Sequence, residues 1–62
     1  MGTRLKKAFA AAKDAGGMQS QMRLAMKAGM SSDKAAAAPD SPENIQKVQA
    51  AFKAVTGKDI QL

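Results

Sequence analysis

The stretch SQMRLAMKAGMSSDKAAAAPDSP, residues 20–42, decides how this chain is organised, because it holds both the start and the stop signals of short helices. Its first part begins with Ser20, whose hydroxyl is a good helix N-cap. Gly29 follows the last periodic position, where a residue with positive φ usually closes a helix. The sequence therefore predicts a short helix over residues 20–28.

The second part of the stretch predicts another short helix, over residues 32–38. Ser31 and Ser32 can both cap its first turn, where backbone N–H groups lack partners. Pro39 ends it, because proline disfavours helical backbone at the preceding residue. The alanines of this segment favour a helix by propensity but offer little area for packing.

Two longer segments, residues 3–15 and 42–56, repeat apolar side chains at helical spacing, so each predicts an amphipathic helix. Thr3 is the predicted N-cap of the first, and Ser41 followed by Pro42 is a strong start for the second. The apolar positions on the two faces are Leu5, Ala8, Phe9, Ala12, Ile45, Val48, Phe52 and Val55.

These segments predict an all-α fold in a single domain over residues 1–62. We expect a compact bundle of four short helices that contains a helix-turn-helix. The tail, residues 57–62, is expected to form a short extended segment or a docked coil.

The composition excludes several classes of function. A chain of 62 residues buries only about 60% of its unfolded surface, so its core is thin and leaves little room for a catalytic pocket. It contains no His and no Cys, which removes the side chains that titrate near neutral pH and the thiolate ligands of metal sites. We expect a binding protein that is not an enzyme and uses no cofactor, metal or small-molecule substrate.

The net charge of +5 is distributed unevenly. Residues 1–34 hold seven basic and two acidic side chains, whereas residues 35–62 hold three of each. A basic half joined to a neutral half predicts a surface that faces a polyanion. The alternative is that the lysines only keep an alanine-rich protein soluble. The chain has no apolar run long enough to span a membrane, so we expect a soluble, cytoplasmic protein.

Four residues within 20–38 meet the steric demands of a helix-turn-helix. Ala25 is small at the point where two helices would cross, and Gly29 permits the positive φ of a tight turn. Met30 can plug the core after the turn. Ala35 is expected to point inward from the second helix.

This register resembles the helix-turn-helix of small Cro-type and repressor-type DNA-binding regulators of phages and of some toxin–antitoxin operons. The residues that carry the resemblance are Ser20, Gln21, Leu24, Ala25, Gly29 and Met30. The double glycine before Gln21 and the run from Pro42 to Gly57 extend it over residues 5–57. The resemblance implies a transcriptional regulator that binds double-stranded DNA as a weak homodimer on a two-fold site.

The chain departs from this pattern in the helix that would read DNA. Related regulators usually carry Ile or Val where Ala35 stands, and several polar residues on the exposed face. Alanine methyls can touch a thymine methyl but cannot make the bidentate hydrogen bonds that discriminate bases. Direct readout is therefore limited, or the motif no longer reads DNA.

If the chain binds DNA, its geometry assigns the contacts. Ser32, Asp33 and Ala36 would face base edges from the start of the helix at 32–38. Residues that offer positive charge or hydrogen bonds would contact the DNA backbone: Arg4, Lys6, Lys7, Ser20, Gln21, Lys27, Ser31 and Lys34. For each serine, a plain helix cap is an equally good interpretation.

Met18, Met22, Met26 and Met30 recur every four residues. Our first interpretation is that they fill gaps in a small core. The alternative is an exposed Met/Ala-rich face that makes the chain a helical protein–protein interaction module, since flexible thioether side chains adapt to many partners. A copper site is a third interpretation, but it lacks the His and Cys ligands that would complete it.

Overall fold

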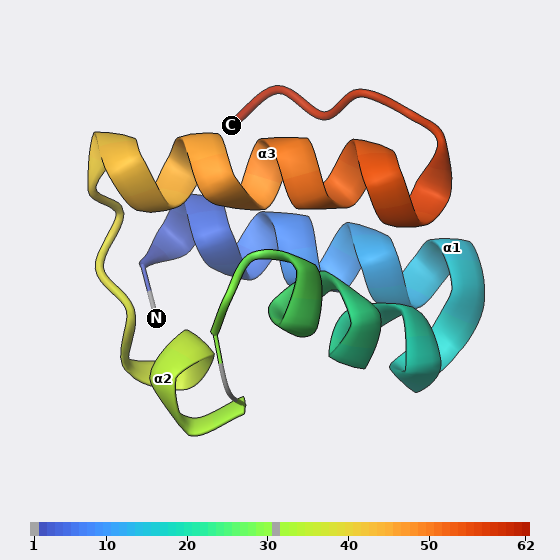
Figure 1. Ribbon diagram of the computed structural model, residues 1–62, viewed down its shortest axis with the longest axis horizontal. Helices are drawn as coiled ribbons and strands as arrows, with labels where there is room; N and C mark the ends of the chain where they lie inside the picture. Colours follow the sequence, from blue (N-terminus) through green and yellow to red (C-terminus); the bar gives the residue numbers. More distant parts are fainter. Residues whose placement is uncertain (1, 31) are drawn as a thin grey trace.

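The computed structural model describes residues 2–30 and 32–62, and helices are the only regular elements in them. Helix α1 spans Thr3–Lys27, α2 spans Ser32–Ala37 and α3 spans Pro42–Thr56. Figure 1 shows α3 lying along the first half of α1, with the six-residue α2 at the N-terminal end of both. None of the described helices is long and apolar enough to cross a membrane.

Helix α1 is sharply kinked at Gly16–Gly17. Gly16 has φ −159° and ψ 17°, and Gly17 has φ 77° and ψ −166°, so neither residue is helical. The positive φ of Gly17 is open to glycine at no steric cost. At this point the chain turns back on itself, and the second half of α1 runs beneath the first in Figure 1. We call these halves the first segment (residues 3–15) and the second segment (residues 18–27).

The predicted bundle of four short helices is wrong. The described residues contain two long helices, α1 and α3, and one helix of only six residues. Residues 20–28 do not form a helix of their own, because helical structure resumes directly after Gly17 and Ser20 lies inside α1 rather than at an N-cap. The double glycine bends α1 without leaving a loop, and α2 is too short to provide a bundle face.

The core lies between the two segments of α1 and α3. Its largest fully buried side chains are Leu5, Leu24 and Val48, one from each of these three parts. Most of the other buried side chains are small, which lets the helices approach closely but limits the apolar area removed from water. The remaining buried residues are Ala8, Phe9, Ala12, Ala25, Ala28, Ala35, Ala38, Ala51 and Phe52.

Helix α3 has the bounds that the sequence predicts. The Ser41 hydroxyl accepts a hydrogen bond from the Asn44 backbone N–H at 3.2 Å, and Pro42 follows as the first helical residue. Gly57 closes the helix in the left-handed conformation, with its N–H bonded to the Lys53 carbonyl at 2.8 Å. Local signals alone therefore fix both ends of this helix.

The N-terminus of α1 is capped from a distant part of the chain. Thr3, the predicted N-cap, is instead the first helical residue, and Gly2 takes the cap position without a side-chain bond. The Asp40 carboxylate accepts hydrogen bonds from the backbone N–H groups of Arg4 at 3.0 Å and Leu5 at 3.1 Å. The turn between α2 and α3 thus supplies the acceptors that the start of α1 lacks.

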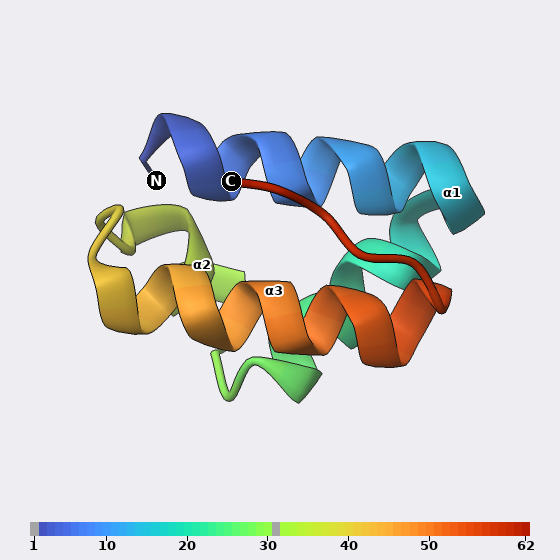
Figure 2. The ribbon, with the colours of Figure 1, turned by 90° about the horizontal axis from the view of Figure 1, so that it is seen from above.

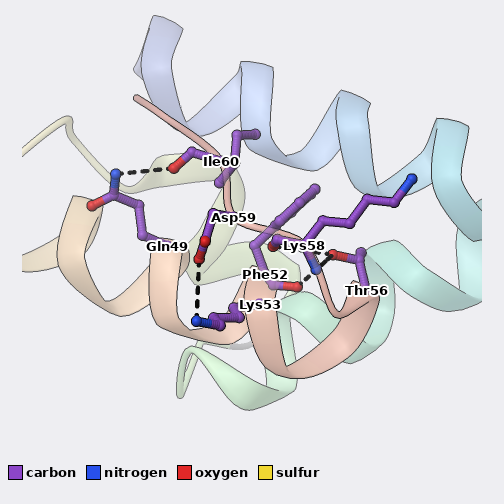
Figure 3. Close-up of polar contacts among 7 residues, drawn as sticks. All are labelled: Gln49, Phe52, Lys53, Thr56, Lys58, Asp59 and Ile60. Carbon is purple, nitrogen blue, oxygen red and sulfur yellow. Dashed lines mark hydrogen bonds and ion pairs between the residues drawn. The ribbon is translucent and has the colours of Figure 1, made fainter.

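The tail after α3 docks as a coil. The Gln49 amide donates to the Ile60 carbonyl at 3.2 Å, and the Lys53 ammonium lies 3.5 Å from the Asp59 carboxylate (Figure 3). Seen from above, this segment passes between the first segment of α1 and α3 (Figure 2). Ile60 and Leu62 pack partly buried against the core. The tail therefore covers part of the core between these two helices.

Candidate nucleic-acid interface and a methionine-lined groove

The turn between α1 and α2 has a defined hydrogen-bond pattern. The Met30 N–H donates to the Ala25 carbonyl at 2.8 Å, and the Gly29 N–H donates to the Met26 carbonyl at 3.0 Å. Together with φ 76° at Gly29, these two bonds form a Schellman motif, which satisfies the last carbonyls of the helix. The chain leaves α1 in one fixed direction as a result.

The packing around this turn agrees with the steric prediction for a helix-turn-helix. Ala25 is buried in the second segment of α1, and Ala35 is buried in α2 with 3% of its surface exposed. Met30 packs partly buried against the core. Ala25 and Ala35 are therefore buried as the sequence predicts, one on each side of the turn, and Met30 is partly buried between them in sequence.

The residues predicted to contact base edges can be followed only in part. Ser32, Asp33 and Ala36 lie in α2 by their backbone, and their side chains fall outside the described part of the structure. Ser31 lies outside the described residues altogether. Lys34, from the middle of α2, has an exposed side chain.

Ser20 and Gln21 are engaged inside the protein. Both are half-buried, and a Cβ atom at Gly16 would force the Ser20 hydroxyl to move. The Gln21 amide donates a hydrogen bond to the Phe9 carbonyl at 2.9 Å. That bond joins the second segment of α1 to the first across the kink.

The predicted basic contacts are exposed and come from two places. Arg4, Lys6 and Lys7 lie on the first turns of α1, and Lys27 is its last residue. The Gly2 N–H donates to the Ala38 carbonyl at 3.1 Å, which holds the start of α1 beside the end of α2. Arg4 is therefore near α2, while Lys27 lies before the turn that leads into it.

Ion pairs neutralise lysines of α3 but not those of α1. The Lys47 ammonium lies 3.2 Å from the Glu43 carboxylate one helical turn away, and Lys53 pairs with Asp59. Within the described residues, no ion pair joins a carboxylate to five of the exposed cations of α1: Lys6, Lys7, Lys13, Arg23 and Lys27. The positive charge that the sequence places in the N-terminal half stays uncompensated on this surface.

Asp40 is the carboxylate whose environment changes its protonation most clearly. The hydrogen bond from the Arg4 backbone lowers its pKa, partial desolvation opposes this change, and the bond from Leu5 and the positive charge of Arg4 lower the pKa further. The net result is a pKa below the ordinary value of 3.8. With its pKa lowered, Asp40 is anionic at neutral pH and caps the start of α1.

A second surface feature is a groove between the end of α1 and the end of α3. Its volume is about 540 Å³, and its lining combines two cations with apolar side chains: Arg23, Met26, Lys27, Ala54 and Val55. Among the described residues, the large hydrophobic side chains exposed to solvent are Met18, Met22 and Met26, at 68%, 59% and 76% of their surface. The interpretation of these three methionines as core residues is therefore wrong, because the kink turns their face away from the core.

The sequence prediction did not include Arg23, Ala54 or Val55 as site residues. A signal was present, since Arg23 and Lys27 are one turn apart and flank Met22 and Met26. No sequence pattern indicated that Ala54 and Val55 of α3 would lie beside these residues. Among the described residues, no three His, Cys, Asp or Glu side chains gather in a group that could hold a metal ion.

Comparison with known proteins adds no assignment: no protein-family model, no curated protein and no solved structure matches this chain. Its function must be inferred from the features of the molecule described above.

Proposed function

We propose that this protein is a small, intracellular DNA-binding protein of the regulator type, with its helix-turn-helix at residues 20–38. The observation that carries the proposal is the turn at Gly29, where a Schellman motif leads from the second segment of α1 toward α2, with a buried alanine on each side, Ala25 and Ala35. Such a unit can present the second of its helices to the major groove of DNA.

Charge supports the same function. The uncompensated cations of α1 include Lys6, Lys7 and Lys27, and Arg4 lies at the end of α1 that is bonded to the residue after α2. Exposed cations of this kind can neutralise DNA phosphates, and the release of counterions drives this step. Lys34 adds a positive charge on α2 itself.

The small size of α2 predicts how selective the binding is. The helix has six residues and three of them are alanine, so the proposed base contacts are limited to Ser32, Asp33 and the methyl group of Ala36. We expect phosphate contacts to supply most of the affinity. A steep dependence on salt and weak discrimination between sequences should follow, with a weak homodimer on a two-fold site adding selectivity.

A fluorescence anisotropy titration with a labelled DNA duplex tests the proposal. At about 50 mM salt the protein should bind duplex DNA, and at about 200 mM salt the affinity should fall by more than tenfold. The double variant Lys6→Gln/Lys7→Gln should weaken binding and reduce the salt dependence. Its control, Lys47→Gln/Lys58→Gln, removes the same charge from the neutral half of the chain and should bind nearly as well as the wild type.

Two results would overturn the proposal. One is the absence of binding to any duplex at the lower salt concentration, where counterion release is most favourable. The other is an equal loss of affinity in both double variants, because net charge alone would then explain the binding without an oriented surface.

A further inference from the structure

We infer that the groove between α1 and α3 binds an acidic amphipathic helix of a partner protein. This inference does not depend on DNA binding, and of the residues that line the groove only Lys27 is also a proposed DNA contact. It concerns the methionine-bearing face of the second segment of α1 together with the last turns of α3, which the proposed DNA contacts leave largely unused.

The apolar part of the groove has the chemistry of a peptide-binding surface. Met26 lines it and is 76% exposed, and Met22, one helical turn earlier, is 59% exposed. Ala54 and Val55 form the opposite wall from α3. Thioether side chains are flexible and polarizable, so such a surface adapts to leucine or phenylalanine side chains of a docked helix.

The charged part of the groove selects an acidic partner. Arg23 and Lys27 both line it, and neither forms an ion pair within the described residues. Three of the five carboxylate side chains of the chain are engaged elsewhere: Asp40 caps α1, Glu43 pairs with Lys47 and Asp59 pairs with Lys53. Glutamate or aspartate side chains beside the apolar residues of a partner helix would form ion pairs with these two cations.

Charge also argues against a second copy of this chain as the occupant. In a symmetric dimer through the groove, Arg23 and Lys27 of one copy would face the same cations of the other. Like charges brought together at an interface are costly. The apolar lining in turn disfavours a nucleic acid here, because phosphates gain nothing from Met26 or Val55.

The probe for this inference is a fluorescein-labelled synthetic helix of roughly 18 residues built from leucine, alanine and glutamate, with leucine along one face. The full-length protein should raise its anisotropy in a saturable titration. A matched peptide with lysine in place of glutamate should bind at least tenfold more weakly.

Variants of exposed residues locate the binding surface without disturbing the core. Met22→Gln/Met26→Gln should weaken binding of the acidic peptide about tenfold, whereas Met22→Leu/Met26→Leu should retain it because the apolar surface is kept. Arg23→Gln should weaken binding about threefold, and its control Lys13→Gln, on the first segment, should have no effect. Circular dichroism confirms that each variant is folded.

Each other outcome contradicts the inference. Acidic-peptide binding that is unchanged in Met22→Gln/Met26→Gln would show attraction by net charge alone. Concentration-dependent dimerisation lost in that variant, measured by sedimentation, would make a second copy the occupant. Co-sedimentation with phosphatidylglycerol vesicles lost in the same variant would make a membrane surface the occupant. Affinity for duplex DNA should be unchanged in Met22→Gln/Met26→Gln, so failure of this inference is separable from failure of DNA binding.

Discussion

Asp40 shows how one side chain stabilises an element that lies far away in sequence. It accepts hydrogen bonds from Arg4 and Leu5, at the positive end of the α1 dipole. We predict that Asp40→Ala lowers the thermal unfolding midpoint at neutral pH, because two backbone N–H groups then lose their acceptor. The exposed Asp14 is a suitable control, and Asp14→Ala should leave the midpoint unchanged.

The pH dependence of this effect follows from the sign of the pKa change. The folded protein lowers the pKa of Asp40, so its contribution to stability is complete above the ordinary value of 3.8. It is lost as the pH falls from there through the lowered folded value. Thermal unfolding followed by circular dichroism should show the wild type and Asp40→Ala converging at acid pH. A difference that persists there would mean that Asp40 acts through packing and not through its charge.

Contacts of single residues with distant parts of the chain could not be predicted from the sequence. Gln21 was predicted to contact the DNA backbone, yet its amide is bonded to Phe9 in the other segment of α1. That partner lies across a kink whose angle depends on the backbone conformation of two glycines. The same holds for Asp40 and α1, since a contact over 36 positions leaves no periodic pattern in the chain.

At the scale of elements, the turn after α1 rests on the conformation of Gly29. A Cβ atom there would meet nothing within 4 Å, so the only cost of a substitution is the backbone strain of a side chain at φ 76°. We predict that Gly29→Ala costs about 1–2 kcal/mol of unfolding free energy, since alanine disfavours the left-handed region. Gly29→Asn should cost less, because asparagine tolerates this region better.

Urea denaturation at constant pH measures both substitutions at Gly29, and the midpoint shift at an unchanged m-value gives the stability difference. Equal costs for alanine and asparagine would argue against a conformational origin. A cost for neither would show that the turn is not held in the left-handed conformation in solution.

The helices differ in how well local sequence determines them. The start of α3 is set by Ser41 and Pro42, which act on their own neighbours, so its bounds could be predicted. The end of α1 at Gly29 was predictable for the same reason. The sequence predicts one helix that ends at residue 15 and a second that Ser20 caps, but whether the two glycines between them end or bend a helix depends on what packs beyond them.

For the whole molecule, the groove shows why the candidate site was only partly predictable. Its α1 wall could be found from the spacing of methionines and cations, but Ala54 and Val55 come from a helix that is distant in sequence. The kink decides which face of the second segment meets α3. Whether the methionines are buried or exposed therefore depends on the tertiary arrangement and could not be predicted from their spacing.

The thin core also predicts that the tail contributes much of the molecule's stability. Of the twelve buried core residues, seven are alanine and two are phenylalanine, and only Leu5, Leu24 and Val48 are large and fully buried. Ile60 and Leu62 add partly buried area against this core. Because both side chains are partly buried, their truncation should remove roughly 2 kcal/mol.

We therefore predict that Ile60→Ala/Leu62→Ala lowers the midpoint of thermal unfolding by roughly 10 °C, because a small domain loses several degrees for each kcal/mol. Gln61→Ala is the matched control, since Gln61 lies between the two and is exposed. Differential scanning calorimetry at neutral pH measures both. If the double variant unfolds at the wild-type temperature, the tail does not close the core in solution, and the helices alone must supply the stability of the fold.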